Sequence, residues 1–503
     1  MIACRTTIGK GAPTKAGKSS SHGAPLGAAE LEGAKRNLGW SHGPFEVPDD
    51  IRAAWKSAGA RGAADVAAWE KRLAASAHRA DFERAFSGEP PAGFAEAADA
   101  YIRKLVDEKP TWATRKSSQE ALQVLPPTDH PLRAWVMARL AAAVQPAPDP
   151  QEPVAMARTA IAMARSLGDP DLLRTVLLAA CSAFSNFASA HECRQLNQEL
   201  VELAVLAQDH LQAQRAHLRL VFDCLDLGDL VAADANIEAY AVLSQSFRQA
   251  QYQWPERLLR AMRALMTGQF SAAEELADEA LALAQRARDP NILFLTVHRW
   301  AQAWISEGRG DILSAAAQFQ TLLQRIQPDY HFTYQSVQAI SQVRSGQLDE
   351  ARSMLREIRK SRELHGWLNY QYFLAEPCHV LNDTELAQKL YDSFLPHSGR
   401  FYVWGITGMF VAPPYSRALG LLDMTLERWD SAVHNLQDAL RRSEALGLRG
   451  WLARVRYELA LALRGRGADG DTEKAHGLQT QARELALQLG QTALLAVMDR
   501  HPA

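Results

Sequence analysis

Residues 11–27 of the chain read GAPTKAGKSSSHGAPLG and include residue types that bind phosphate. The Gly-Lys-Ser run at 17–19 has the order that ends a nucleotide-binding P-loop, whose backbone N–H groups surround a phosphate. A P-loop has four residues between its first glycine and the Gly-Lys pair, whereas five residues separate them after Gly11. A P-loop also leads directly into a helix, and Pro25 would interrupt such a helix in its second turn. The spacing argues against a nucleotide site.

Two other groups of residues have types suited to metal or peptide binding. His191 and Cys193 could form half of a metal site, but no second pair of ligands accompanies them. Trp300, Trp304 and the aromatic run 367–373 could line a peptide groove. Their helical spacing is more often that of a core between helices. We therefore expect no metal site, and we expect these aromatic side chains to be buried.

The composition limits the class of protein. The 503 residues carry a formal charge of −2, which gives no general attraction to nucleic acid or to membrane surfaces. No apolar run approaches the roughly 18 residues of a transmembrane helix, and the start MIACRTTIGK lacks the order of a signal peptide. The five cysteines are scattered and form no Cys-x-x-Cys pair, as in proteins of reducing compartments. We expect a cytoplasmic protein with no nucleic-acid or membrane partner.

The sequence changes character near residue 125. Residues 1–125 are rich in glycine and proline, and helical patterns are short there. A proline-rich junction with a first helix follows over 126–153. From 128 to 500 almost everything has the pattern of paired helices rich in Ala, Leu, Gln and Arg. The elements that must position any site are therefore of two different kinds.

A repeat organises residues 128–500. Each copy begins with a turn residue, followed by a large apolar residue two positions later and alanine five positions later, as in Gly268, Phe270 and Ala273. Clear or degenerate copies start at residues 228, 268, 310, 346, 382, 427 and 470, so successive copies are 36–45 residues apart. Offsets of 5, 9 and 12 within a copy lie on one face of a helix. One such hairpin cannot bury its own apolar face, so neighbouring copies must stack.

This pattern resembles the tetratricopeptide repeat, although the period is nearer 40 residues than 34. The phrases ALMTGQFSAAEELADEALALAQRARDP and GLRGWLARVRYELALALRGRGADGDTEKA also resemble the helical-repeat regions of bacterial STAND-type regulators. The resemblance implies a mainly all-α fold over 128–500, a right-handed superhelix of about eight or nine hairpins. It also implies a protein or peptide ligand in the concave face.

Residues 1–125 resemble a different family. The phrases SHGAPLG, LGWSHGPFEVPDDIRAAW, FSGEPPAGFAEA and WATRKSS follow one another as in transketolase, at the end of its diphosphate-binding domain, the linker and the start of its pyrimidine domain. By this resemblance His22 corresponds to a histidine of the thiamine diphosphate site, and Arg115 to an arginine that holds the sugar phosphate. The opening segment MIACRTTIG (1–9) would be a late strand of the first sheet.

Other parts of the transketolase pattern are not found in this sequence. Its Gly-Asp-Gly motif for diphosphate and Mg²⁺ is absent from the 503 residues, and helical repeats follow Leu125 where an acidic residue and a phosphate-binding serine are expected. We therefore expect an incomplete mixed α/β fragment, as in a gene fusion, with no cofactor. Thiamine diphosphate and Mg²⁺ would be required if the chain were a transketolase.

Three hypotheses follow for the function. The first is a non-enzymatic scaffold that binds a partner protein through its repeats. The second is thiamine diphosphate-dependent transfer of a two-carbon ketol unit between sugar phosphates, with His22 and Arg115 in the site. The third is a sensor arm whose STAND-type ATPase is encoded elsewhere. The sequence does not define the oligomeric state.

Overall fold

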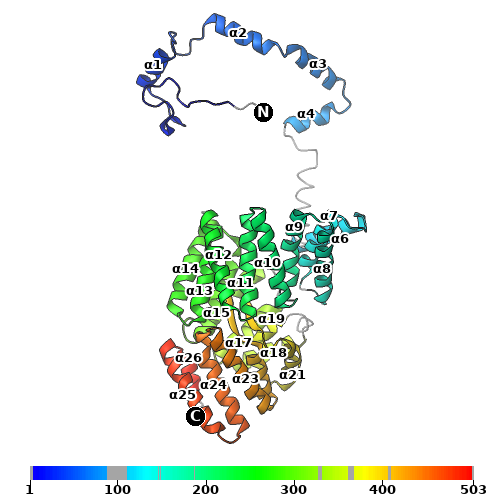
Figure 1. Cartoon of the computed structure of the whole chain (residues 1–503), viewed down its shortest axis with the longest axis vertical. Helices are drawn as coiled ribbons and strands as arrows, with labels where there is room; N and C mark the ends of the chain where they lie inside the picture. The colour runs from blue at the N-terminus through cyan, green and yellow to red at the C-terminus, as the bar shows by residue number, and fades with distance from the viewer. Residues whose placement is uncertain are drawn as a thin grey trace. The chain divides into compact units, whose positions relative to one another are not determined.

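The computed structural model describes residues 4–87, 110–145, 147, 149–185, 187–247, 249–326, 331–360, 368–405 and 409–500. The chain divides into two compact units, residues 1–107 and 108–503, and each is described by itself (Figure 1). Within the described residues, no helix is both long enough and apolar enough to cross a membrane.

The first unit consists of loops and short helices. They are η1 (Ser19–Ser21), α1 (Ala28–Asn37), α2 (Asp49–Ala60), α3 (Ala63–Ala74) and α4 (Arg79–Ser87). The predicted strand at 1–9 is wrong over its described residues, because residues 4–7 take no regular structure and residues 8 and 9 lie in a turn. A lone strand leaves its backbone N–H and C=O groups unpaired, and no second strand is present among residues 4–87 to pair with it.

The first unit also lacks a hydrophobic core of its own within residues 4–87. None of the residues of α2, α3 or α4 is buried. Trp55 and Phe86 have 76% and 82% of their surface exposed. Only small side chains such as Ala12 and Ala34 are buried, where α1 packs against the opening loop. The helices of this unit therefore form from local sequence preference rather than from shared burial.

The second unit is an array of helices joined by short turns. Its α-helices are α6 (Pro110–Val124), α7 (Pro131–Val144), α8 (Gln151–Ser166), α9 (Pro170–Phe184), α10 (Ala190–Leu206), α11 (His210–Asp226), α12 (Leu230–Phe247), α13 (Ala250–Met266), α14 (Phe270–Ala287), α15 (Leu293–Ser306), α16 (Ile312–Ile326), α17 (His331–Arg344), α18 (Leu348–Lys360), α19 (Leu368–Gln371), α20 (Ala375–Leu381), α21 (Thr384–Phe394), α22 (Tyr415–Thr425), α23 (Trp429–Ala445), α24 (Arg449–Arg466), α25 (Asp471–Leu489) and α26 (Thr492–Arg500). Successive helices pack side by side (Figure 1). The prediction of a mainly helical chain is confirmed; the tetratricopeptide-like superhelix remains a prediction.

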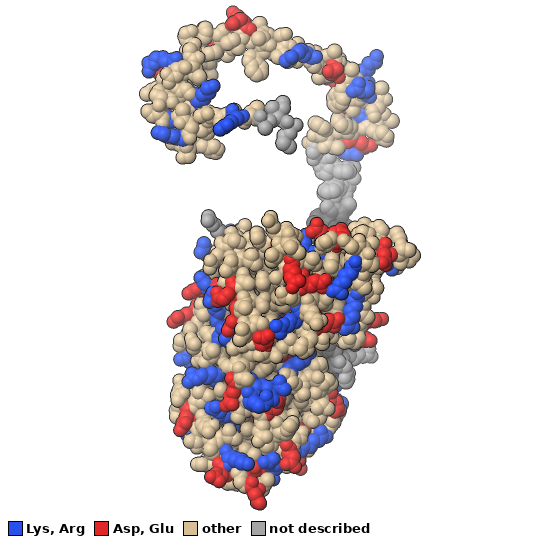
Figure 2. All heavy atoms as spheres, viewed as in Figure 1, with Lys and Arg blue, Asp and Glu red and all other residues tan. Residues whose placement is uncertain are grey.

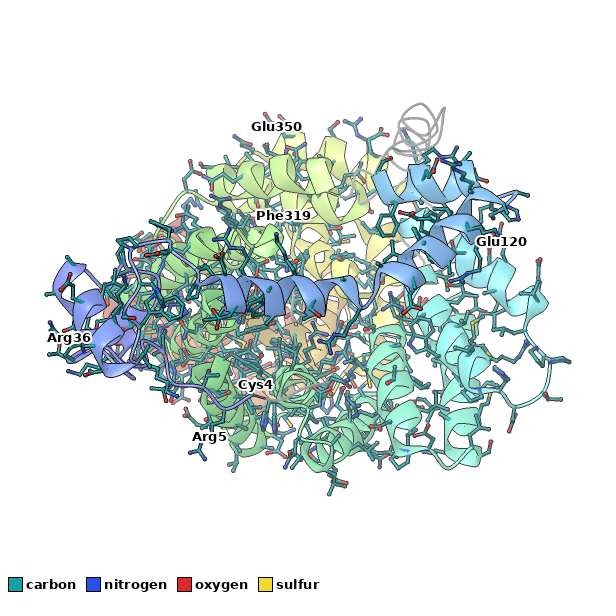
Figure 3. The ribbon with its side chains drawn as sticks, turned by 90° about the horizontal axis from the view of Figure 1, so that it is seen from above. Cys4, Arg5, Arg36, Glu120, Phe319 and Glu350 are labelled. Atoms are coloured by element: carbon teal, nitrogen blue, oxygen red, sulfur yellow. The ribbon has the colours of Figure 1, made fainter. Side chains whose placement is uncertain are left out.

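The repeat register agrees with the turns and the burial of the helices. Gly268 has φ +77°, and a Cβ added there would lie 2.8 Å from Leu489 Cδ2, so glycine is required at this turn. In two degenerate copies Asn382 and Glu427 take the same left-handed conformation, with φ 55° and 58°. Residues at offsets 5, 9 and 12 are buried in most copies, as at Ala273, Ala277 and Ala280. In Figure 3 Phe319, at offset 9, lies inside the helical unit, whereas Glu120 and Glu350 lie at its edge.

A two-stranded antiparallel hairpin interrupts the helices, and sequence analysis does not predict it. Its strands are β1 (Phe401–Trp404) and β2 (Phe410–Pro414), with Val403 opposite Val411. The hairpin contacts α11, α13, α22 and α23, which are far apart in the sequence. Every residue of β2 is buried. The hairpin therefore belongs to the core of the unit.

Side-chain donors satisfy the outer edge of β2. His298 Nδ1 lies 2.9 Å from the carbonyl oxygen of Met409, Trp451 Nε1 donates to that of Val411 at 3.2 Å, and the Tyr372 hydroxyl donates to that of Pro413 at 2.9 Å. These three carbonyls are two residues apart, so they point to the same side of the strand. A buried strand edge would otherwise leave its carbonyls unpaired at a cost of about 1–3 kcal/mol each. The donors come from α15, α24 and η4 (Tyr372–Leu374).

Aromatic side chains pack around the hairpin. Trp300 and Trp304 are stacked with ring centres 5.3 Å apart, and Phe373 meets both rings edge-on. All three side chains are buried. The interpretation of these aromatics as core rather than as a peptide groove is therefore confirmed for Trp300, Trp304, Tyr372 and Phe373, while Trp367 lies outside the described residues.

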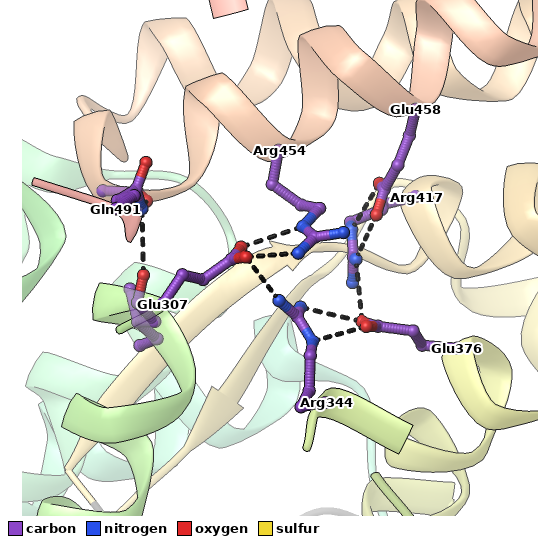
Figure 4. A network of polar contacts seen from close by, with 9 residues as sticks. Glu307, Arg344, Glu376, Arg417, Arg454, Glu458 and Gln491 are labelled. Atoms are coloured by element: carbon purple, nitrogen blue, oxygen red, sulfur yellow. Dashed lines mark hydrogen bonds and ion pairs between the residues drawn. The ribbon is translucent and has the colours of Figure 1, made fainter. Parts of the chain in front are cut away.

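A buried ionic network joins five elements beside the hairpin (Figure 4). Its members alternate in charge in the order Glu458, Arg417, Glu376, Arg344, Glu307 and Arg454. Arg344 Nη1 lies 2.8 Å from Glu307 Oε2, and Arg417 Nη2 lies 3.1 Å from Glu376 Oε2. Each of the six side chains has 10% or less of its surface exposed. The three negative and three positive charges balance.

The network determines the ionisation of Glu376. Burial alone would raise the pKa of this carboxyl, but the guanidinium groups of Arg344 and Arg417 outweigh burial and lower its pKa to about 2. Glu376 is therefore charged at neutral pH. Removal of one guanidinium would leave its carboxylate partners buried and only partly compensated.

We predict that Arg417→Met destabilises the protein by about 3–5 kcal/mol, because Glu376 and Glu458 each lose a buried partner. Urea unfolding followed by circular dichroism measures the change. The control is Arg441→Met, since Arg441 pairs with Asp438 with 68% of its side chain exposed; it should change stability by less than about 1 kcal/mol. Equal effects of the two substitutions would contradict the structural role of the network.

Candidate functional site

The opening loop uses its phosphate-binding groups for internal contacts. The backbone N–H groups of Thr14 and Lys15 donate to the carboxylate of Glu30, at 3.1 Å and 3.3 Å. Lys15 Nζ donates to the carbonyl of Leu26, and the Gly17 N–H donates to that of Ile8. The hydrogen bonds from Thr14 lower the pKa of Glu30, so this carboxyl is a stable anion. The anion that this loop surrounds is therefore its own glutamate side chain.

The two residues assigned by resemblance lie in different units. His22 follows η1, is exposed, and donates its backbone N–H to the Ser19 carbonyl. Arg115 lies in α6, and its side chain is outside the described part of the chain. Their proposed roles in cofactor and phosphate binding remain predictions.

The possible metal ligands do not converge within the described residues. No group of three or more His, Cys, Asp or Glu side chains is placed to hold a metal ion there. His191 is exposed, whereas Cys193 is buried and its thiol contacts the Phe184 carbonyl at 3.7 Å. Burial raises the pKa of the Cys193 thiol, which disfavours the thiolate that a metal requires.

A groove of about 830 Å³ opens along one side of the helical unit. It is lined by α7, α9, α11 and α13, with the turn after α14 and the start of α15 at one end. We call it the arginine groove, after Arg139, Arg215, Arg219 and Arg288 in its lining. Met409, just before β2, also lines it, so the hairpin forms part of the groove wall.

The arginine groove carries excess positive charge. Arg139, Arg215 and Arg288 are exposed, and none of them pairs with an acidic group within the described residues. Arg219 donates to the Leu178 carbonyl and the Ser182 hydroxyl. The one acidic lining residue, Asp289, accepts a 2.8 Å hydrogen bond from Trp254 Nε1. Elsewhere both signs of charge are interspersed on the face shown in Figure 2.

A smaller cavity of about 330 Å³ lies between α9–α11 and the hairpin. We call it the hairpin cavity. Its polar lining includes Asn197, Asp223, Asp226 and Arg400, and it shares Arg219 with the arginine groove. Arg400 binds both carboxylate oxygens of Asp226 through its Nε and Nη2 atoms, which joins β1 to α11 across 174 residues.

Asp223 is the unusual group of the hairpin cavity. Its Oδ2 accepts a 2.6 Å hydrogen bond from Asn197 Nδ2. Burial raises its pKa to about 7, against the opposing effect of the Asn197 hydrogen bond, and Asp226 adds to the rise. Sequence analysis does not single out this residue. The available signal was weak: two acidic residues three positions apart, Asp223 and Asp226, in the otherwise apolar stretch LVFDCLDLG.

Comparisons with known proteins concern the N-terminal quarter of the chain. The family described as "Transketolase, thiamine diphosphate binding domain" matches residues 1–91. A transketolase of Cereibacter sphaeroides is 53% identical over 125 residues, which cover 25% of this chain and 19% of that protein. Transketolase 2 of Xanthobacter flavus is 46% identical over 132 residues, with 25% and 19% covered. Transketolase 1 of Escherichia coli K12 is 41% identical over 132 residues, with 25% and 20% covered.

The chain therefore spans about a fifth of the length of these curated relatives. The transketolase resemblance of the N-terminal region is confirmed, with a thiamine diphosphate-binding domain matched at 1–91. The resemblance of residues 128–500 to tetratricopeptide-like and STAND-type repeats stays a prediction.

We predict that Asp223 makes the protein less stable as pH rises toward neutrality. An aspartate carboxyl has a pKa of 3.8 before folding, and Asp223 has a pKa of about 7 in the fold, so folding binds a proton between these values. The stabilisation is full below about pH 4 and is lost as pH rises through about 7, at up to about 1.4 kcal/mol per pH unit. Asp223→Asn should remove this slope from urea unfolding curves recorded between pH 5 and 8. Glu202→Gln, on the exposed side of α10, should retain it.

Proposed function

We propose that this protein is a binding scaffold and that its helical unit holds an extended acidic segment of a partner protein in the arginine groove. The observation that carries the proposal is the charge of that groove. Three exposed arginines, Arg139, Arg215 and Arg288, line it without acidic partners in the described residues. Side chains of Asp and Glu in a partner would complement them.

The groove also offers an apolar surface for such a segment. Tyr252 and Phe294 are half-buried in its wall, and the buried Trp254 is held by Asp289. Aromatic side chains of this kind anchor protein ligands because each buries a large area with little loss of conformational freedom. A groove of about 830 Å³ is within the usual range for binding sites.

An extended ligand suits this lining better than a helical one. Each guanidinium has five N–H donors in a planar fork. An extended segment presents free backbone carbonyls together with its side-chain carboxylates, whereas the backbone carbonyls of a helix are already bonded within it. The arginines come from α7, α11 and the turn after α14, so they can contact successive positions of one extended chain.

The second candidate function is ketol transfer, favoured by the match of residues 1–91 to the transketolase cofactor-binding domain. The described residues do not fit that cofactor. Mg²⁺ requires a nearly octahedral set of oxygen ligands, and no cluster of acidic side chains is placed for it in the described ranges. The N–H groups of Thr14 and Lys15 in the opening loop are bound to Glu30. We therefore assign no catalytic step to His22 or Arg115. The sensor-arm hypothesis is compatible with the scaffold proposal.

The groove proposal predicts the peptides that the full chain selects from a random-peptide display library. Selected sequences should be rich in Asp and Glu, and a labelled selected peptide should bind more weakly as salt increases. The double variant Arg139→Glu, Arg215→Glu should lose at least about tenfold in affinity by fluorescence polarisation.

The matched control is Arg286→Glu, which changes an exposed arginine of α14 outside the groove and should leave affinity unchanged. Failure to select any peptide, or selected peptides whose affinity is unaffected by the double variant, would overturn the proposal.

For the cofactor we predict no saturable heat when the full chain is titrated with thiamine diphosphate and Mg²⁺ in a calorimeter. The reason is the internally bonded loop and the lack of converging acidic ligands in the described residues. The Escherichia coli relative serves as the positive control for the titration. Saturable binding that Mg²⁺ strengthens would replace the scaffold proposal by the transketolase alternative.

A further inference from the structure

The hairpin cavity contains two hydrogen-bond acceptors that have no donor. Asn197 is 3% exposed, and its Oδ1 has no hydrogen-bond partner. Asp223 Oδ2 accepts from Asn197 Nδ2, whereas no hydrogen bond reaches Asp223 Oδ1 within the described residues. Rotation of the Asn197 amide would turn its carbonyl toward the carboxylate, so the observed orientation is the favourable one. The cavity is therefore lined by two residues, Asn197 and Asp223, that each have an acceptor oxygen without a donor in the described residues.

The other charged groups of the cavity define a second, complementary position. Asp226 and Arg400 neutralise each other through their two-fold ion pair. Arg219 lies one turn before Asp223 on α11 and forms hydrogen bonds to the Leu178 carbonyl and the Ser182 hydroxyl, but it has no carboxylate partner among the described residues. Arg219 and Asp223 thus lie on one face of one helix, where the guanidinium acts to lower the pKa of the carboxyl, but no hydrogen bond or ion pair joins the two side chains in the described residues.

Part of the remaining wall is apolar. Phe222 and Trp404 line the cavity and are 8% and 7% exposed. Gly405 approaches the Phe222 ring closely, since a Cβ added there would lie 3.4 Å from Cγ. The volume of about 330 Å³ suits a small molecule and is near the lower end of the usual range for ligand sites.

We propose that the hairpin cavity binds a free L-amino acid with an apolar side chain. Its ammonium group donates to Asp223 Oδ1 and Asn197 Oδ1, its carboxylate accepts from Arg219, and its side chain packs against Phe222 and Trp404. An ammonium group has three N–H donors and no acceptor, which matches two free acceptor oxygens. The carboxylate–guanidinium contact is a charge-assisted hydrogen bond.

Binding is coupled to a proton at Asp223. Burial raises the pKa of Asp223 to about 7, with Asn197, Asp226, Arg219 and Arg400 as the groups around it. A ligand ammonium beside the carboxylate would lower that pKa again. Binding at pH 7 therefore releases part of a proton from Asp223 to the buffer.

This inference does not rest on the proposed scaffold function. The two sites share Ser182 and Arg219 but use different ligands, and the Asp223 carboxylate lies in the hairpin cavity only. A failure to select peptides would therefore overturn the scaffold proposal without affecting amino-acid binding. A failure of amino-acid binding would likewise leave the scaffold proposal unaffected.

The test begins with thermal unfolding of the full chain in the presence of each of the twenty common L-amino acids at millimolar concentration. At least one apolar amino acid should raise the midpoint, because a ligand of the folded state stabilises it. Calorimetry should then give an affinity at least about tenfold weaker for the N-acetylated form, which lacks the ammonium group. Titrations in phosphate and in Tris at pH 7 should differ in heat through proton release.

Substitutions locate the site. Asp223→Asn should weaken binding at least about tenfold and abolish the buffer dependence, since it replaces the charged acceptor. Glu202→Gln is the matched carboxyl-to-amide control on the exposed side of α10 and should leave both unchanged. The proposal is overturned if none of the twenty amino acids stabilises the protein, if the N-acetylated form binds equally well, or if Asp223→Asn binds like the unaltered chain.

Discussion

The ion chain from Glu458 to Arg454 is the constraint on which the rest of the helical unit depends. Charges buried this deeply cost several kcal/mol each unless every one has a partner in good geometry. Glu376 and Glu307 each bind two arginines, so the position of one helix determines the positions of its neighbours. An apolar contact tolerates small sliding of helices, whereas an alternating chain of hydrogen-bonded charges does not. The network therefore fixes the relative register of α15, α17, α20, α22 and α24.

The hairpin depends on that register. Trp451 and His298, which contact its outer carbonyls, lie on α24 and α15, and the network joins both of these helices. The third donor, Tyr372, lies in η4, directly before the network helix α20. At its other end Arg400 connects the hairpin to Asp226 on α11. The hairpin thus contacts both the C-terminal helices α22 and α23 and the earlier helices α11 and α13, so the positions of the two groups depend on each other. Both candidate sites lie at this contact, because Met409 lines the arginine groove and Trp404 lines the hairpin cavity.

Local features of this fold were predictable from the sequence and distant pairings were not. The repeat register is a local pattern, since a turn residue such as Gly268 and the buried Ala273 lie in one hairpin. The hairpin strands have no helical period and pair with donors that are 40 or more residues away, so nothing in FYVW or FVAPP identifies their partners. Arg417 is a charged residue inside the apolar run YSRALGLL, which indicates a buried ion pair. The sequence does not identify its partners, Glu376 and Glu458, because they come from other repeats. Asp223 was missed for the same reason, because its raised pKa comes from burial by elements brought together only in the fold.

The two units differ in how far apart in the sequence their hydrogen-bonded groups lie. Residues 4–87 resemble part of a larger domain, and side chains such as Trp55 and Phe86 remain exposed because the described part of that unit provides no core to cover them. In its opening loop the backbone N–H groups of Thr14 and Lys15 donate to the carboxylate of Glu30, which is only 16 and 15 residues away from them in the sequence. In the helical unit, in contrast, buried side chains bond to distant partners, as Tyr372 does over 41 residues and Gln491 over 186. Asn197 Oδ1, which lacks a partner, and the exposed arginines of the groove lie in the helical unit, and ligand binding is therefore expected there.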